Sequence, residues 1–299
     1  MLFFIGWHQP NNGESGCQRL PYCMISINRL LSRRSRFTVQ KWILDSGAFS
    51  RITTKRGHLS TKRYARLIMK LYWSGELLAA VSQDYLCNEI ALNATGLDIK
   101  THQQLTILRY DRLMEDIKQE FVEQRKRWLY AQLAADLDED FNDTELEEVL
   151  AEEAEPPYLM PTLQGQSPTD YLSHLEQYGN RLSPGQWVGV GSLLGRYPGA
   201  IEEILIAIHQ RRPDLKLHGF GIKKKALQSG IIHTLLHSAD SQAHGFKQAG
   251  ETGQKFKGTN HPERAINYLQ QLQTQPLQLS LFPVIHPLHN LKSEKSPTT

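Results

Sequence analysis

The stretch that decides the fold is Lys41-Trp42-Ile43-Leu44-Asp45-Ser46-Gly47-Ala48-Phe49-Ser50. Its apolar first half is typical of a short buried strand, and the serine and glycine after Asp45 are typical of the loop that follows. The same order recurs along the chain. It predicts further strands at Leu2–Ile5, Leu77–Ser82, Tyr158–Leu163, Trp187–Val190, Leu215–His218 and Ile232–Ser238, the last beginning as a helix end.

Longer segments between these runs have apolar residues at helical spacing. They predict helices over Lys62–Trp73, Thr169–Tyr178 and Ala200–Gln210. Repeated strand–loop–helix units of this length indicate a parallel α/β fold, and about seven of them favour a closed (β/α)8 barrel of the TIM type. Polar residues at the strand ends then face one mouth, where we expect Asp45, Asp84, Gln164, Ser192, His218 and Asp240 to converge.

The predicted domain organisation is one barrel over residues 1–271 with an interruption at about 103–156. Leu113, Ile117 and Phe121 form a helical stripe there, and an acidic block follows, so we expect an inserted helical hairpin whose stripe serves packing. Residues 272–299 are rich in Gln and Pro and predict a disordered tail.

Charge is distributed unevenly along the 299 residues. Lys and Arg number 34 and Asp and Glu 31, but eleven of the acids lie between Asp136 and Glu155, without a basic residue among them. Outside this block 34 basic residues face 20 acids, and twelve Lys/Arg surround Asp45 between Arg29 and Lys70. This asymmetry favours a nucleic-acid partner, and we expect backbone contacts from Arg33, Arg34, Lys55, Arg56, Lys223 and Lys224.

Bulk properties exclude several other classes. No apolar run is long enough to cross a bilayer, and Met1–Ile5 is too short for a signal sequence, so we expect a cytoplasmic protein without membrane contact. Three cysteines, Cys17, Cys23 and Cys87, form an odd and widely spaced set, which is typical of a reduced protein.

Two patterns that invite a cofactor or metal assignment do not support one. Gly189-Val190-Gly191-Ser192-Leu193-Leu194-Gly195 has neither dinucleotide-binding spacing nor the Lys-Ser/Thr of a P-loop. His233 and His237 are four residues apart but lack further zinc ligands. We therefore expect no cofactor and no metal, and interpret the glycines as places where a flat ligand approaches the backbone.

Several motifs together resemble the tRNA-guanine transglycosylase superfamily. Asp45-Ser46-Gly47-Ala48-Phe49 is similar to its Asp-Ser-Gly-Gly-Phe motif, and Leu217-His218-Gly219-Phe220-Gly221 to its Leu-Met-Gly-Val-Gly element. Asp84 matches its guanine-reading aspartate, although an aspartate there could equally cap a helix. Gln164-Gly165 matches its base loop, Gly189-Val190-Gly191-Ser192-Leu193 its glycine-rich strand end, and Asp240 its nucleophile.

Three departures are closer to the DpdA-like branch, which exchanges guanine in DNA for a 7-deazaguanine. The second glycine of the first motif is Ala48, Ser241-Gln242-Ala243-His244 replaces the family's Pro-Thr-Arg, and the cysteine-rich zinc site is absent from the sequence. The resemblance thus implies a pentosyltransferase that acts on DNA in preference to tRNA. A tRNA-guanine transglycosylase and a non-catalytic nucleic-acid-binding barrel are the alternatives.

The resemblance also implies roles for the candidate residues. Asp240 would attack the sugar and Asp45 would shuttle a proton. Tyr22, Phe49 or Phe220 would stack on the extruded base. The residues expected to bind the base or lie against it are Ser46, Gly47, Asp84, Gln164, Gly165, Gly189, Gly191, Ser192, His218, Gly219 and Phe220.

A short peptide in the tail is a separate motif. Gln278-Leu279-Ser280-Leu281-Phe282 resembles the peptides by which bacterial DNA enzymes dock on the replication sliding clamp. In such peptides the Leu and Phe side chains anchor in an apolar groove. A chance match in a Gln/Leu-rich segment remains the alternative, and so does a segment packed on the barrel.

Overall fold

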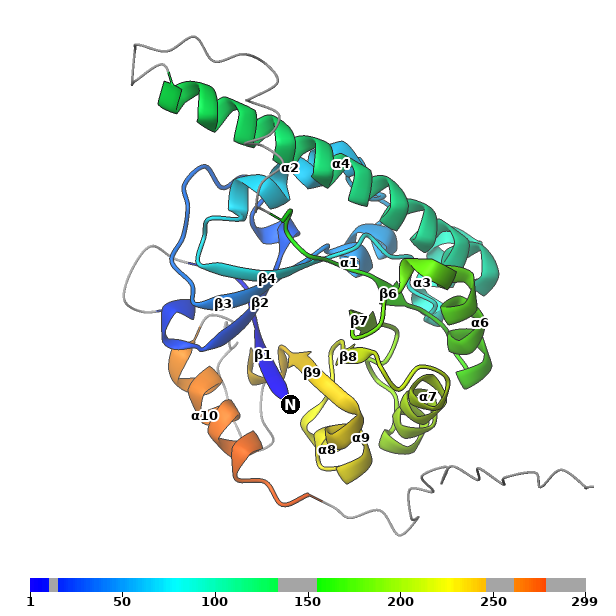
Figure 1. Cartoon of the computed structure of the whole chain (residues 1–299). Coiled ribbons are helices and arrows are strands. Elements are labelled where there is room, and N and C mark those ends of the chain that lie inside the picture. Colours follow the sequence, from blue (N-terminus) through cyan, green and yellow to red (C-terminus); the bar gives the residue numbers. More distant parts are fainter. Residues whose placement is uncertain (11–15, 134–154, 246–260, 278–299) are drawn as a thin grey trace, which may run out of the picture.

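Parallel strands surrounded by helices form a barrel in the computed structural model (Figure 1), which describes residues 1–10, 16–133, 155–245 and 261–277. Within these residues, nine strands follow one another in the order β5-β4-β3-β2-β1-β9-β8-β7-β6, and every pairing is parallel. The strands are β1 Leu2–Trp7, β2 Tyr22–Ser26, β3 Lys41–Asp45, β4 Glu76–Val81, β5 Leu159–Met160, β6 Thr162–Leu163, β7 Trp187–Val190, β8 Lys216–Gly219 and β9 Leu236–Ser241.

The barrel closes through β5 and β6, which only Pro161 separates. The amide of Ser82 donates to the carbonyl of Met160 (3.0 Å) on one side, and the amide of Gly189 donates to the carbonyl of Pro161 (2.8 Å) on the other. This segment therefore fills one strand position between β4 and β7. The prediction of a (β/α)8 barrel is confirmed, with eight strand positions in a closed ring.

Alternate side chains of each strand face opposite sides, which creates two apolar layers. The barrel interior contains Phe4, Met24, Ile43, Ala79, Val81 and Met160, which pack together away from water. The outward residues, such as Ile5, Ile25 and Trp42, join a larger cluster beneath the helices. Near-continuous apolar runs fit strands that are buried on both faces.

The helices cover the outside of the ring (Figure 1). They are α1 Ala48–Thr53, α2 Thr61–Leu71, α3 Glu89–Thr95, α4 Ile99–Leu133, α6 Pro168–Tyr178, α7 Pro198–Arg211, α8 Lys224–Leu227, α9 Gly230–Leu235 and α10 Pro262–Gln273, with short 3₁₀ turns η1 Cys17–Arg19, η2 Ile27–Arg29, η3 Gly179–Arg181 and η4 Ala243–Gly245. Cap residues fix several of their starts. Ser60 accepts from the Arg63 amide at the start of α2, and Ser167 and Asp170 form a reciprocal capping box at α6.

Two boundaries differ from those that the sequence predicts. β2 was not among the predicted strands, because the stretch between Cys17 and Cys23 resembles a loop. Tyr22–Ser26 nevertheless forms a strand that is buried on both faces. The predicted run Ile232–Ser238 begins as the end of helix α9, as expected, and its strand, β9, extends beyond the predicted end to Ser241. As a result Asp240 lies within a strand and not in the loop after it.

The segment predicted as an inserted hairpin begins with a single long helix. Helix α4 starts at Ile99, before the predicted boundary, and packs against α2 and α6 with Leu113 and Ile117 buried. Its first half thus belongs to the outer layer of the barrel. The second half of the predicted hairpin and the peptide Gln278–Phe282 lie outside the described residues, so those assignments stay predictions.

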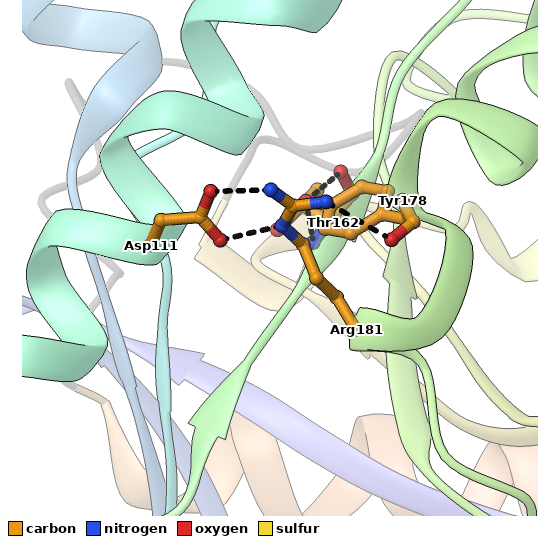
Figure 2. A network of polar contacts seen from close by, with 4 residues as sticks. All are labelled: Asp111, Thr162, Tyr178 and Arg181. Atoms are coloured by element: carbon orange, nitrogen blue, oxygen red, sulfur yellow. Dashed lines mark hydrogen bonds and ion pairs between the residues drawn. The ribbon is translucent and has the colours of Figure 1, made fainter.

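A polar network joins α4 to the barrel wall (Figure 2). The guanidinium of Arg181 donates to both carboxylate oxygens of Asp111 (2.6 and 2.9 Å) and to the carbonyl of Tyr178. The buried hydroxyl of Tyr178 then donates to the carbonyl of Thr162 (3.1 Å) and accepts from its amide (3.3 Å). The network ends two residues before Gln164, so it fixes the approach to the mouth.

Tyr178→Phe should therefore destabilise the fold more than Asp111→Asn does. The first variant leaves the buried amide and carbonyl of Thr162 without their partner and should lower the free energy of unfolding by about 1–2 kcal/mol. The second loosens an exposed ion pair and should cost less than about 1 kcal/mol. Urea unfolding measures both, and equal losses would contradict this description of the network.

Candidate active site

The carboxyl ends of the strands bring the predicted polar residues to one mouth. Ser26 on β2 is in register with Asp45 on β3, and Phe4 on β1 with Asp240 on β9. The described contacts join Asp84 to Gln164 and His218 to Asp240. The structure thus brings together the acids and amides that the sequence singled out.

Asp45 ends β3 at the point where the chain turns sharply. Gly47 has φ +68°, and a Cβ at this position would come within 2.1 Å of Asn28 Nδ2. The same amide of Asn28 donates to the Gly47 carbonyl (3.0 Å), so glycine is needed both for its backbone conformation and for space. Gly47 begins α1, which presents Phe49 beside the mouth with 40% of its surface exposed.

The carboxyl group of Asp45 is surrounded closely enough to be hard to ionise. The pKa of Asp45 is raised to about 6, chiefly by desolvation. Hydrogen bonds with the Ser26 hydroxyl and the Gly47 backbone oppose this rise, and the charge of Asp240 adds to it. A carboxyl with this pKa exchanges protons readily near neutral pH, which suits proton transfer.

A chain of hydrogen bonds orients Gln164 toward Asp84. The amide of Cys87 donates to Ser192 Oγ (2.9 Å), whose hydroxyl donates to Gln164 Oε1 (2.6 Å). The other end of the Gln164 amide, Nε2, donates to Asp84 Oδ2. Ser192 adopts φ +55°, which is uncommon for a residue with a side chain and holds its hydroxyl in this chain.

Asp84 is the second carboxyl whose ionisation is suppressed. Desolvation and then the charge of Asp45 raise its pKa to about 7, while its own backbone and the side chains of Gln164 and Ser46 lower it. Two buried acids that repel one another in this way are typical of functional sites. Asp84 does not cap α3, whose first turn Asn88 caps instead.

Asp240 is the third acid, on the opposite wall. The amide of Gly221 donates to its Oδ1 (2.9 Å), and His218 Nε2 lies 3.4 Å from the same oxygen. No described residue donates a hydrogen bond to Oδ2. Among the described residues, therefore, one carboxylate oxygen is held by a hydrogen bond and the other has no donor.

The glycines of the sequence motifs make room for side chains at the mouth. A Cβ on Gly191 would come 2.0 Å from Gln164 Nε2, and one on Gly189 would come 2.3 Å from the ring of Phe220. Gly165 packs against Asp170, whose carboxylate accepts hydrogen bonds from the backbone amides of Gln166 and Ser167. Gly219 contacts Ile222 in the wall and does not face the mouth.

Several supporting residues were not found from the sequence. Arg196 donates to the carbonyls of Ser192, Gly165 and Gln166 and so ties the β6 and β7 loops together. Gln103 on α4 donates to the carbonyls of Gln164 and Asp170. Neither residue belongs to a recognisable motif, because each acts on backbone atoms far away in the sequence.

Among the aromatic candidates, Phe49 and Phe220 lie at the mouth and Tyr22 does not. Tyr22 begins β2 in register with Lys41 and packs edge-on against Phe4 inside the barrel. Phe220 follows β8, with its ring 4.7 Å from that of His218. The rings of Phe49 and Phe220 therefore remain as candidates for stacking.

The predicted basic residues are spread over different surfaces. Arg33 is tied to the carbonyls of Pro10 (2.6 Å) and Ser35 (3.0 Å), while Arg34 is exposed nearby. Lys223 and Lys224 precede and begin α8, and Lys224 donates to Gln271 on α10.

Lys55 and Arg56 are exposed on the turn after α1, close to the mouth. Arg51 and Arg63, which the sequence analysis did not single out, join Arg56 there: burial and then the charges of Arg63 and Arg56 lower the pKa of Arg51. These three arginines form a concentration of positive charge beside the mouth, which we call the arginine cluster.

Two hollows occur at the opposite end of the barrel. One of about 290 Å³ is lined by Tyr110, Pro157 and Glu155, and another of about 240 Å³ lies beside Leu2 and Leu269. Neither contains the acids or the amide described above. In the described ranges no three His, Cys, Asp or Glu residues gather in an arrangement that would hold a metal ion, and no helix is long and apolar enough to cross a membrane.

The raised pKa values predict how stability depends on pH. Asp45 and Asp84 bind protons more tightly in the folded protein than in the unfolded chain. Their contribution to the free energy of unfolding is therefore fully present below the pKa of an unfolded aspartate, about 4, and is lost as the pH rises through about 6 and 7. Asp84→Asn should flatten the fall in unfolding free energy between these limits. Urea titrations at several pH values test this, and an unchanged slope would show that Asp84 is ionised throughout.

One family model matches most of the chain, over residues 2–124 and 138–266, and its description is DpdA, DeoxyPurine in DNA protein A. The matched ranges contain all three acids of the mouth, the Gln164 loop and both basic turns. No curated protein matches the sequence. The extent of this match shows that the chain belongs to the DpdA family.

Proposed function

We propose that this protein exchanges guanine in DNA for a 7-deazaguanine through a covalent bond between Asp240 and the sugar. The observation that carries the proposal is the division of the mouth into two parts. On one wall Asp240 has one oxygen held by the Gly221 amide and the other unpartnered among described residues. Across the mouth Asp84 and Gln164 form an acid–amide pair, and Asp45 couples electrostatically to both acids.

The acid–amide pair suits the edge of a guanine. Guanine presents N1–H and the exocyclic amino group as donors, and an ionised Asp84 can accept from both, while the backbone near Gly191 and the Gln164 amide can serve its carbonyl. An extruded base would reach these groups only after it leaves the helical stack. The partly exposed ring of Phe49 and the ring of Phe220 beside His218 are the candidates to stack on its faces.

The reaction proceeds in two balanced steps. Asp240 Oδ2 attacks the anomeric carbon of the sugar, the glycosidic bond breaks, and guanine leaves with the bonding electrons and takes up a proton. The incoming 7-deazaguanine then loses its N9 proton and attacks the same carbon, and the ester bond to Asp240 breaks. Asp45, with a pKa of about 6, carries the proton between these steps.

Asp240→Ala should abolish the covalent protein–DNA adduct, whereas Asp45→Asn should only slow the turnover of this adduct. The first variant removes the attacking oxygen, and the second leaves it in place but removes the proton carrier. Denaturing electrophoresis of protein mixed with guanine-containing DNA would detect the covalent species. Both variants should retain DNA affinity.

Matched DNA and tRNA substrates carrying radiolabelled guanine should separate the two transglycosylase alternatives. Release of label from DNA alone supports the proposal, and release from tRNA alone overturns it. A wild-type protein that binds DNA but forms no adduct and releases no label would favour the non-catalytic alternative.

The arginine cluster should account for part of the salt dependence of DNA binding. Reversing Arg56 and Arg63 to Glu should lower the slope of log Kd against log salt by about 0.9 for each phosphate that the protein no longer neutralises. A matched control reverses Lys118 and Lys216, which lie toward the amino ends of β5 and β8. Equal slopes in the two double variants would show that the protein binds the phosphates elsewhere.

The tail peptide Gln278–Phe282 remains a proposed sliding-clamp ligand. It follows the last described residue, Leu277, and so lies beyond the barrel elements that form the mouth. Binding of a synthetic peptide with this sequence to a bacterial clamp tests the proposal without the rest of the chain.

A further inference from the structure

A chain of three side chains, the half-buried Trp187 and the buried Ser238 and His218, runs beneath the mouth and ends at the acid proposed as the nucleophile. Trp187 Nε1 lies 2.8 Å from Ser238 Oγ, and Ser238 Oγ lies 2.9 Å from His218 Nδ1. The other nitrogen of His218, Nε2, is 3.4 Å from Asp240 Oδ1. His218 and Ser238 are fully buried, so these contacts do not compete with bulk water.

The direction of the chain follows from the chemistry of its first member. The indole N–H of Trp187 can only donate, so Ser238 Oγ accepts from it. The hydroxyl proton of Ser238 is then free to donate to His218 Nδ1, which places the imidazole proton on Nε2. In the opposite tautomer Ser238 Oγ would accept from both Trp187 and His218, and a lone pair of Nε2 would face the Asp240 carboxylate.

The imidazole ring is also held in its plane by aromatic neighbours. The ring centroids of Phe4, Trp187 and Phe220 lie 5.9, 6.0 and 4.7 Å from that of His218, and all three rings meet it edge to face. The ring therefore has one orientation available, with Nε2 toward Asp240. Among the described residues Nε2 makes no hydrogen bond in this geometry, and Asp240 Oδ1, 3.4 Å away, is the acceptor that the described contacts place nearest to it.

We propose that His218 is a positioning residue for Asp240, which it serves as a neutral Nε2–H donor set by Trp187 and Ser238. This inference rests on the proposed function of Asp240. The Gly221 amide and His218 approach the same oxygen, Oδ1, and leave Oδ2 to bond the sugar. When the ester later breaks, negative charge returns to the carboxylate, and donors already in place stabilise it as it leaves.

This role predicts that the two half-reactions differ in their sensitivity to His218. A donor to Oδ1 stabilises the departing carboxylate, so its loss should slow breakdown of the adduct more than formation. His218→Met, which fills space without an N–H, should slow breakdown by about tenfold to a hundredfold, and the adduct should accumulate. His218→Gln can place an amide N–H near the position of Nε2 and should restore most of the rate.

The kinetic test mixes each variant with guanine DNA, then adds 7-deazaguanine and follows adduct formation and decay separately by denaturing electrophoresis. Accumulated adduct in His218→Met, together with rescue in His218→Gln and unchanged DNA affinity, supports the role. Equal losses in both variants, or formation and decay that fall together, would make His218 merely structural.

A second measurement needs no DNA and so remains informative if the proposed reaction is wrong. The ¹⁵N resonances of the His218 ring, assigned by their loss in His218→Gln, report which nitrogen carries the proton. The proposal expects the proton on Nε2 in the wild type and a changed tautomer balance in Ser238→Ala. A proton on Nδ1 in the wild type overturns the proposed donor, whereas a proton on Nε2 in a protein that forms no adduct would retain the hydrogen-bond chain and reject its role in the reaction.

Discussion

The double pairing of residues 159–163 is the constraint on which the rest of the structure depends. This short segment is hydrogen-bonded to β4 through Met160 and to β7 through Pro161, and so it turns an open parallel sheet into a ring. Closure of the ring brings the carboxyl ends of β3 and β9 to the same mouth as the carboxyl end of β6, which Gln164 follows. Proline is tolerated there because its carbonyl, and not its missing N–H, makes the bond to β7.

Closure concentrates three carboxyl groups in a space that water reaches poorly. Desolvation, and after it the repulsion between the acids, raises the pKa of Asp45 and Asp84, and this destabilises the fold as the pH rises. Such a loss of stability is typical of functional sites, because acids that titrate near neutral pH can both accept and release protons. The same crowding explains why small residues stand at Gly47, Gly189 and Gly191, where a side chain would displace a neighbour.

The sequence predicted the barrel and most of its strands because short apolar runs followed by polar residues are a local pattern. It likewise predicted the strand-end positions of Asp45 and Gln164, since an ordered set of short motifs places them. It could not reveal β2, which a proline and two cysteines disguise, or the continuous helix α4. The roles of Arg196 and Gln103 were also hidden, because their partners are backbone carbonyls that only the folded chain brings near.

The bond between Gln164 and Asp84 has a consequence for selectivity. In the structure the acid and the amide satisfy one another, so a base that binds to them under the proposed function would have to disturb this bond. Guanine would compensate for the disturbance with its N1–H and amino donors, whereas adenine would present the lone pair of N1 to an ionised Asp84. Under the proposed function, discrimination against the wrong purine would come less from a poor fit than from the lost hydrogen bond between Gln164 and Asp84.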